Sequence, residues 1–172
     1  GNIGYMQIST FADDTADLSQ KAATQFKNQH VKGIVLDLRD DPGGLLDAAI
    51  HVSSLWLPQK QLILQEKRGN VVEQSYDSLG NDTLNGVPTV VLINGGSASA
   101  SEITTGALHD NKDAYVIGEK SYGKGVVQQL ICIDSSNSGS KSDGEICPAD
   151  SGQLKVTVAS WYRPNGQNIN HR

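Results

Sequence analysis

One segment, residues 88–129, constrains the fold of this chain more than any other stretch. It contains two apolar runs, 89–93 and 114–117, separated by a run of small residues and a helix-forming stretch. Two strands joined by a helix normally lie parallel with a right-handed crossover, so both end at the same edge of one sheet. The loops that follow them, 97–101 and 120–125, then open on one side, where open α/β sheets bind ligands. A serine of the first loop and a lysine of the second can therefore become neighbours.

The rest of the chain continues the alternation of strands and helices. Leu18, Ala22 and Phe26 recur at helical spacing and predict a helix that buries this face. A second helix follows residue 44 and is stopped by Pro58. Further strands are predicted at residues 2–8, 33–38, 62–66, 71–76, 126–133 and 153–162. The pattern predicts an α/β fold in one compact domain over residues 1–172.

Composition and charge disfavour several classes of function. The 172 residues are 37% hydrophobic and carry a formal net charge of -5, which disfavours nonspecific binding to nucleic acid. No apolar stretch approaches the roughly 18 residues of a membrane-spanning helix, and no signal peptide opens the chain. Because the chain starts directly in a predicted strand, we expect an excised domain. The missing signal peptide then says little about location.

The two cysteines flank a polar stretch with almost no core-forming residues. Cys132 and Cys147 enclose it, and we expect residues 133–150 to be a flexible insertion. A disulfide closing about 15 residues stabilises a fold by roughly 3 kcal/mol in the chain-entropy model. Such a bond suits an oxidising, extracytoplasmic compartment. The alternative is two unpaired thiols. Ligand partners at zinc spacing are absent.

The turn at residues 41–44, Asp-Pro-Gly-Gly, follows a mostly apolar predicted strand. If this strand is parallel to the other two, the turn opens at the same edge of the sheet. Gly43 and Gly44 would then present unhindered backbone N–H groups at a helix start, where negative charge is favoured. A tight turn that needs glycine for backbone reasons explains the same pattern.

Three serines compete as a nucleophile in the loop after residue 93. Ser99 begins the sequence Ser-Ala-Ser-Glu, which matches a helix capping box, so a plain helix cap is one interpretation. The other is a nucleophile at a helix N-terminus, with the N–H of Ala100 directed at a developing oxyanion. Ser97 and Ser101 are rivals that composition alone does not separate from Ser99.

Lys124 is a better candidate base for such a serine than the nearby histidine. His109 and Asp110 lie ten and eleven positions beyond Ser99 on one predicted helix, which is roughly 15 Å or more at about 1.5 Å per residue. Lys124, in contrast, is brought to the right edge by the parallel strands. An ordinary lysine has a pKa of about 10.4, and burial against apolar walls would lower it. An exposed loop lysine is the alternative.

The same loop contains a false phosphate-binding motif. Residues 118–125 resemble G-x-x-x-x-G-K-[S/T], but Gly125 replaces the hydroxyl residue that would hold Mg²⁺. The loop also leads into the β-branched pair Val126-Val127 rather than into a helix, as a phosphate cradle requires. Nucleotide binding is therefore disfavoured.

Several stretches together resemble the carboxyl-terminal processing peptidases, also called tail-specific proteases. They are Ile34-Val-Leu-Asp-Leu-Arg-Asp-Asp-Pro-Gly-Gly-Leu-Leu46, Gly96-Ser-Ala-Ser-Ala-Ser-Glu-Ile103, Gly118-Glu119 and Tyr122-Gly-Lys-Gly-Val-Val-Gln128. In that family a serine and a lysine 25 positions apart form the catalytic dyad, and this spacing selects Ser99 and Lys124. A glutamine four positions after the lysine completes the family's triad, which is the place of Gln128.

The resemblance also assigns an oxyanion hole. The Pro-Gly-Gly turn corresponds to the family's oxyanion loop, so Gly43 or Gly44 is implied as one donor and the N–H of Ala100 as the second. On a regular strand, Lys124 and Gln128 lie about 13 Å apart at their Cα atoms. Their pairing therefore requires a bent backbone or two converging side chains.

The resemblance implies a ClpP/crotonase-like α/β superhelix with a mostly parallel central sheet and flanking helices. The implied activity is a serine endopeptidase that cleaves proteins near accessible C-termini by acyl transfer, outside the cytoplasm, with no metal or organic cofactor. Members usually carry a PDZ domain beside this core, and no PDZ-like segment is visible here. Membrane association is expected only through other parts of a longer chain.

This sequence departs from the family pattern in two further places. It ends before the Gly-Ile-x-Pro-Asp stretch expected next, and the cysteine-flanked loop looks like an insertion. Two alternatives stay open: a binding module of the same fold without protease chemistry, and a crotonase-like acyl-CoA enzyme. The presence of both Ser99 and Lys124 argues against each of them.

Overall fold

The structure is a computed structural model that describes residues 2–111, 114–133 and 152–170. Nearly all of the expected insertion at 133–150, including Cys147, lies outside these residues. The flexibility of the insertion and the disulfide to Cys132 therefore stay predictions.

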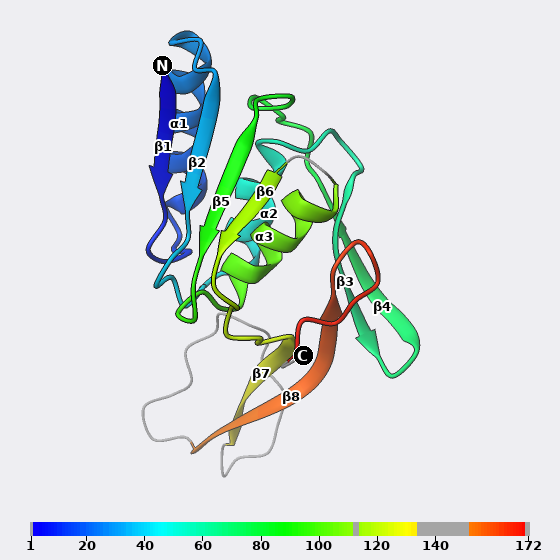
Figure 1. Cartoon of the computed structure of the whole chain (residues 1–172). Coiled ribbons are helices and arrows are strands. Elements are labelled where there is room, and N and C mark those ends of the chain that lie inside the picture. Colours follow the sequence, from blue (N-terminus) through cyan, green and yellow to red (C-terminus); the bar gives the residue numbers. More distant parts are fainter. Residues whose placement is uncertain (1, 112–113, 134–151, 171–172) are drawn as a thin grey trace.

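A four-stranded parallel sheet forms the centre of the fold (Figure 1). In spatial order its strands are β1 (Ile3–Gln7), β2 (Gly33–Asp37), β5 (Thr89–Ile93) and β6 (Ala114–Gly118). Pairing is parallel throughout, with Leu36 of β2 aligned to Val91 of β5. Both of these side chains are fully buried, as expected for inner strands of a parallel sheet. The predicted α/β class with a mostly parallel sheet is confirmed.

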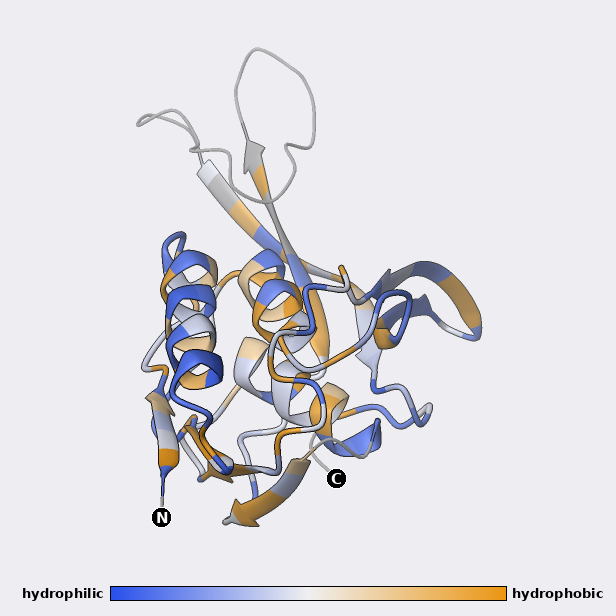
Figure 2. Cartoon of the chain, turned by 90° about the horizontal axis from the view of Figure 1, so that it is seen from above, coloured by the Kyte–Doolittle hydropathy of each residue, from blue (hydrophilic) through white to orange (hydrophobic). Residues whose placement is uncertain are grey.

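Three helices lie on one side of the parallel sheet, as the two perpendicular views show (Figures 1 and 2). They are α1 (Thr15–Asn28), α2 (Leu46–Ser54) and α3 (Ala100–Asp110). The core between sheet and helices includes the fully buried side chains of Leu38, Val52 and Leu108. Among the described residues, no helix combines the length and the apolar character that crossing a bilayer demands.

The predicted buried face of helix α1 is confirmed in part: Ala22 and Phe26 pack against the core, but Leu18 does not. Thr15, Ser19 and Ala23 are buried, whereas Leu18 is 56% exposed and Phe26 is only partly buried. The Ser19 hydroxyl donates to the Thr15 carbonyl at 2.7 Å, so this small polar side chain is satisfied within its own helix. The fully buried positions of α1 are therefore small residues, and the large side chain of Leu18 points to solvent.

A second, antiparallel sheet stands beside the first. In spatial order its strands are β4 (Val71–Asp77), β3 (Leu62–Arg68), β8 (Gly152–Tyr162) and β7 (Val126–Ile133). The predicted hairpin of β3 and β4 is confirmed, with Arg68 paired to Val71 across the turn. The pairing of β3 with β8 joins the two hairpins of this sheet, and the sequence pattern does not predict it. The β7–β8 hairpin projects away from the helical layer (Figure 2).

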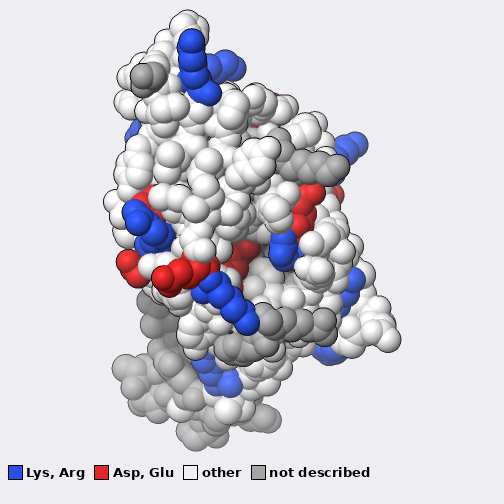
Figure 3. All heavy atoms as spheres, viewed as in Figure 1, with Lys and Arg blue, Asp and Glu red and all other residues white. Residues whose placement is uncertain are grey.

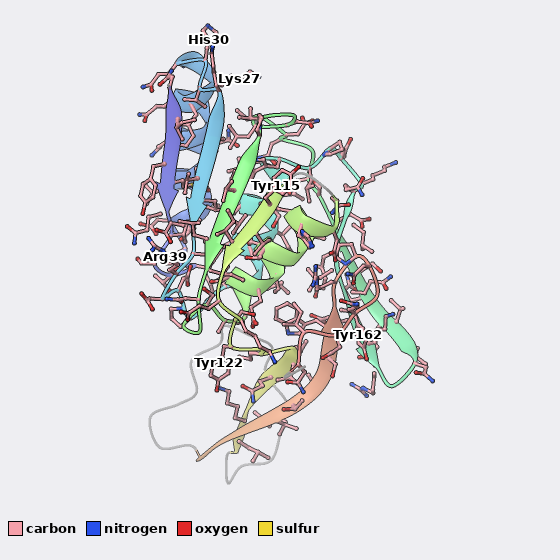
Figure 4. All side chains as sticks on the ribbon, in the orientation of Figure 1. Lys27, His30, Arg39, Tyr115, Tyr122 and Tyr162 are labelled. Atoms are coloured by element: carbon pink, nitrogen blue, oxygen red, sulfur yellow. The ribbon has the colours of Figure 1, made fainter. Side chains whose placement is uncertain are left out.

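The other face of the parallel sheet is not covered by any described element. It exposes Ile3, Tyr5, Tyr115 and Ile117, each at least 55% exposed. Tyr115 lies on β6 in Figure 4, and the face seen in Figure 3 carries few charged side chains over these strands. Within the described residues, the parallel sheet is therefore covered on one side only.

Candidate active site

Three loops meet at the carboxyl edge of the parallel sheet, as the sequence pattern predicts. They follow β2, β5 and β6 and cover residues 38–45, 94–99 and 119–125. The Ala98 N–H donates to the Asp41 carbonyl at 3.0 Å, which joins the first loop to the second. The Tyr122 N–H donates to the Ser97 carbonyl at 3.0 Å, which joins the third to the second. The site is therefore built on backbone hydrogen bonds between segments distant in sequence.

Ser99 sits at the N-cap of α3 in a backbone conformation that side-chain-bearing residues rarely adopt. Its φ is 53° and its ψ is -114°. Such a conformation costs on the order of 1–3 kcal/mol and is typical of functional sites. Ser99 and Glu102 form the predicted capping box, in which the Ser99 N–H donates to Glu102 Oε2 at 2.9 Å. Helix capping and a functional role are therefore both compatible with this residue.

The hydroxyl groups of the two rival serines are buried and donate hydrogen bonds to backbone carbonyls. Ser97 is fully buried, and its hydroxyl donates to the Leu38 carbonyl at 2.7 Å. Ser101 is also fully buried, and its hydroxyl donates to the Asp41 carbonyl at 3.0 Å. Ser99 is the only one of the three that is partly exposed and lines a cavity.

Glu102 joins the Ser99 turn to the Lys124 loop. Its side chain is almost fully buried, with 4% of the residue exposed. One carboxylate oxygen, Oε2, accepts hydrogen bonds from the backbone N–H groups of both Ser99 and Lys124, each at 2.9 Å. The other, Oε1, accepts from the Gly123 N–H and the Ser121 hydroxyl, each at 2.7 Å. The backbones of Ser99 and Lys124 therefore lie within two hydrogen-bond lengths of each other.

The same two residues share an open cavity of about 580 Å³ between α3, the first turn of α2 and the antiparallel sheet. Its polar lining includes Ser99, Lys124 and Gln128. The full lining set is Gly44, Leu45, Leu46, Leu64, Glu66, Tyr76, Ser99, Ile103, Lys124, Val126, Val127, Gln128, Lys155, Val158 and Trp161. Lys124 and Gln128 thus line the same cavity. A register shift in the β7–β8 pairing between Val127 and Gln128 shows that β7 is not the regular strand on which the separation of about 13 Å was calculated.

The two glycines of the turn differ in whether their backbone N–H is hydrogen-bonded. The Gly43 N–H donates to Asp41 Oδ1 at 2.8 Å. Gly44 lines the cavity, and its N–H has no acceptor among the described residues. The N–H of Ala100, at the start of α3, also lacks an acceptor within the described chain. Gly44 and Ala100 are therefore the two candidate oxyanion donors with a free N–H, and Gly43 is not.

Gly43 serves the site in another way. A Cβ on this residue would lie 2.6 Å from the Ala98 carbonyl oxygen and 2.8 Å from both the Ala100 nitrogen and Ser99 Cβ. Its φ of 94° is also in the region that favours glycine. The glycine turn therefore packs directly against the Ser99 turn, at a distance that no other residue type permits.

An ion pair between the buried Asp37 and the exposed Arg39 lies at the start of the first loop. Arg39 donates from Nε to Asp37 Oδ1 at 2.8 Å and from Nη2 to Oδ2 at 2.6 Å, and Tyr5 donates to Oδ2 at 2.7 Å. The hydrogen bonds from Arg39 are the main cause that lowers the pKa of Asp37 well below its usual range. Arg39 lies at the carboxyl end of β2 (Figure 4).

The structure separates His109 and Asp110 from the Ser99 cavity. Asp110 is paired with Arg163 near the far end of α3 and also accepts from the Asn165 side-chain amide at 3.1 Å. His109 lines a different cavity, which Arg163 also borders. The geometric argument against a Ser-His-Asp triad on this helix is therefore confirmed.

Two buried carboxyl residues of the site were missed by sequence reasoning. Glu102 was recognised as a capping residue only, and its spacing to Ser99 gave no sign of contacts with the Lys124 loop. Asp41 was treated as part of a turn, although an acid that precedes Pro-Gly-Gly can accept from a backbone N–H two residues on. In the described part of the chain, no three acidic, histidine or cysteine side chains are grouped as metal ligands.

Comparisons with known proteins place the chain among the peptidases. A model of peptidase family S41 matches residues 2–172. The chain is 37% identical over 173 residues to the carboxy-terminal-processing protease of Bartonella bacilliformis, covering 98% of this chain and 36% of that protein. It is 34% identical to the carboxy-terminal processing protease CtpA of Bacillus subtilis, covering 99% and 33%.

Among solved structures, the photosystem II D1 C-terminal processing protease superposes with a TM-score of 0.83 at 35% identity. The match covers 98% of this chain and 39% of that one. The chain thus spans little more than a third of the length of the curated relatives it matches.

Proposed function

The chain belongs to peptidase family S41, and we propose that it is the catalytic core of a serine protease that processes proteins at their carboxyl ends. The observation that carries this proposal is the shared Glu102 oxygen, which holds the backbones of Ser99 and Lys124 together beside one open cavity. A serine and a lysine at one cavity supply a nucleophile and a base for acyl transfer.

The reaction begins with proton transfer within the pair. The Lys124 side-chain amine takes the proton of the Ser99 hydroxyl, and Oγ forms a bond to the carbonyl carbon of the scissile peptide. The resulting lysine ammonium then gives its proton to the leaving amine as the C–N bond breaks, which leaves an acyl-enzyme. Water, deprotonated by the same amine, attacks the ester, and the proton returns to Ser99.

The tetrahedral oxyanion is held by backbone donors. We assign this role to the N–H groups of Gly44 and Ala100, because both lack an acceptor within the described residues. Ala100 directly follows Ser99, and Gly44 lines the same cavity as Ser99. Removing one donor of an oxyanion hole typically lowers kcat by about 10²–10³-fold. Gln128, which lines the same cavity as Lys124, is assigned as a hydrogen-bond partner that orients the lysine side chain.

The substrate class follows from the walls of the cavity. Leu64, Ile103 and Trp161 line it beside the candidate pair and favour an apolar side chain near the scissile bond. Proteins with accessible carboxyl ends are the proposed substrates, in keeping with the names of the relatives. A PDZ domain in the full-length protein and an extracytoplasmic location belong to the same proposal.

Two non-protease functions compete with this one. A ligand-binding module of the same fold would use the apolar cavity without chemistry, and a crotonase-like acyl-CoA enzyme would use the oxyanion turn without the serine and lysine. Neither explains why Ser99 adopts a strained backbone beside Lys124. A serine-directed acylating probe separates a protease from both, because only an activated Ser99 forms an adduct.

The direct test is cleavage of an unfolded polypeptide that ends in apolar residues. The full-length protein is incubated with it, and mass spectrometry identifies the products. We expect Ser99→Ala and Lys124→Ala each to abolish cleavage while the fold survives, because each removes one half of the pair. Lys120→Ala is the matched control, since Lys120 is an exposed lysine of the same loop. Turnover like the wild type by a folded Lys124→Ala protein would contradict the proposal.

A further inference from the structure

We propose that Asp41 is a positioning residue of this site. Its carboxylate binds the Gly43 N–H and thereby turns the glycine loop so that the Gly44 N–H, and not the Gly43 N–H, faces the oxyanion. The inference rests on the proposed function, because it assigns a role in the same acyl-transfer step.

The hydrogen bond from Gly43 fixes the orientation of one peptide group. The Gly43 N–H donates to Asp41 Oδ1 at 2.8 Å, and Asp41 is fully buried. A charge-assisted bond of this kind is stronger than a bond between neutral groups. Because the acceptor belongs to the same turn, the Gly43 N–H is held inside the turn and away from the cavity.

The opposite side of Gly43 is fixed as well. Its carbonyl accepts the Phe11 N–H at 2.9 Å and the Thr10 hydroxyl at 3.1 Å. The Leu45 N–H in turn donates to the Phe11 carbonyl at 2.8 Å, so Gly44 lies between two anchored neighbours. In this arrangement Gly44 is the residue of the turn whose N–H remains available, and it lines the Ser99 cavity.

Asp41 also connects the glycine turn to the serine turn through its main chain. Its carbonyl accepts both the Ala98 N–H and the Ser101 hydroxyl, each at 3.0 Å. One residue therefore sets the position of the oxyanion turn through its side chain and the position of the nucleophile turn through its backbone. Only the first of these functions depends on the identity of the side chain.

The second carboxylate oxygen of Asp41 adds a cost in stability rather than a hydrogen bond. Asp41 Oδ2 is buried and has no hydrogen-bond partner among the described residues. An unsatisfied buried acceptor is unfavourable for folding. Within the described residues, the hydrogen bond from Gly43 to Oδ1 is therefore the one that the Asp41 carboxylate accepts.

The test compares Asp41→Ala with Asp41→Asn in the full-length protein. Asparagine keeps an oxygen that accepts the Gly43 N–H, and alanine removes it. We expect Asp41→Ala to lower kcat by about 10- to 100-fold with KM within about twofold, because the oxyanion exists only in the transition state. Asp41→Asn is expected to keep kcat within about threefold of the wild type.

The control variant is Ser53→Ala. Ser53 is fully buried on α2, and its hydroxyl, like Asp41 Oδ2, has no partner among the described residues. Its loss perturbs the core without touching the glycine turn, so kcat should not change. Rates are referred to the fraction of protein that a serine-directed acylating probe titrates, so partial unfolding does not count as lost catalysis.

A peptide aldehyde supplies a second readout, because its adduct with Ser99 places an oxygen in the oxyanion hole. We expect Asp41→Ala to weaken aldehyde inhibition by the same factor as kcat and Asp41→Asn to restore it. The inference is overturned if folded Asp41→Ala keeps the wild-type kcat, or if folded Asp41→Asn loses 100-fold. The Asp41→Asn result stands even if Asp41→Ala does not fold. If the wild type itself neither cleaves nor reacts with the probe, the proposed function fails instead.

Discussion

At the scale of single residues, the site stores unfavourable free energy at two positions. Ser99 holds a positive φ, and Asp41 is a fully buried acid with one unpartnered oxygen. Each cost is local and is offset by the packing of the surrounding loops. Substitutions at these two positions can therefore raise stability, and at Ser99 this gain is expected to accompany the loss of the proposed activity.

We predict that Ser99→Gly is more stable than Ser99→Ala by about 1–3 kcal/mol in free energy of unfolding. Both variants lack the hydroxyl and are expected to be inactive. Glycine, however, adopts a φ of 53° and a ψ of -114° without the clash of a Cβ. Denaturant unfolding of the two variants measures the difference. Equal unfolding free energies would show that the Ser99 backbone is not strained.

Ionisation of the buried Asp41 makes the free energy of unfolding depend on pH. Burial is the largest cause that raises the pKa of Asp41 from 3.8 to about 6, against the opposing hydrogen bond from the Gly43 N–H. Below pH 3.8 the carboxyl is neutral in both the folded and the unfolded chain and costs nothing through ionisation. Above pH 6 it is charged in both, and the folded chain is less stable by about 3 kcal/mol than it would be with a neutral group.

Asp41→Asn should therefore gain stability relative to the wild type as the pH rises from about 4 to 6, and the gain should level off above that range. Denaturant unfolding of both proteins at several pH values measures it. Asp40→Asn is the control, because Asp40 is exposed and accepts from the Asn94 amide at 2.9 Å. A difference between Asp41→Asn and wild type that stays constant with pH would contradict the shifted pKa.

At the scale of elements, the decisive contact is between helix α3 and the loop that enters β7. The Glu102 carboxylate on the first turn of α3 accepts four hydrogen bonds, and three of them come from residues 121–124. No other described acid at this edge bridges the two segments. The loop therefore depends on one helical side chain for its position beside Ser99.

We predict that Glu102→Ala frees this loop without unfolding α3. The backbone N–H groups of Gly123 and Lys124 lose their acceptor, so their amide hydrogen exchange should accelerate by at least about 10-fold, and activity should fall by about 10²-fold. Glu73→Ala is the control, since Glu73 pairs with Arg68 in the exposed β3–β4 hairpin. Unchanged exchange at Gly123 and Lys124 in Glu102→Ala would refute the bridging role.

The elements themselves were largely predictable, because their signals are local. Strands and helices that the structure confirms are identified by apolar runs, by turn glycines and by Pro58 after the second helix. The buried face of α1 was predicted only in part, since hydrophobic periodicity favours Leu18 over the small residues that are buried, while Ala22 and Phe26 do pack against the core. The pairing of β3 with β8 was not predictable, because it joins segments almost a hundred residues apart.

The candidate site, too, was predictable in part. The parallel-strand argument brought Ser99 and Lys124 to one edge, and the structure places them together. The sequence did not distinguish Gly43 from Gly44, because the difference lies in the side chain of Asp41. Contacts of this kind depend on loop geometry, which hydrophobic pattern and residue spacing do not determine.

At the scale of the whole molecule, the candidate site lies where the two sheets meet. The parallel sheet supplies Ser99 and the glycine turn through its loops, and the antiparallel sheet supplies Gln128 and Trp161 along its strands. Neither sheet alone encloses the cavity. A chain that retained only the parallel sheet and its helices would keep the serine but lose one wall of the site.

The most direct test of the whole arrangement is covalent labelling of the full-length protein with a serine-directed acylating probe, followed by peptide mapping. The adduct is expected on Ser99 and on neither Ser97 nor Ser101, because those hydroxyls are buried and already donate to carbonyls. Lys124→Ala should abolish the adduct, and Lys120→Ala should leave its rate unchanged. An adduct on another serine, or labelling of Lys124→Ala at the wild-type rate, would contradict a Ser99–Lys124 pair.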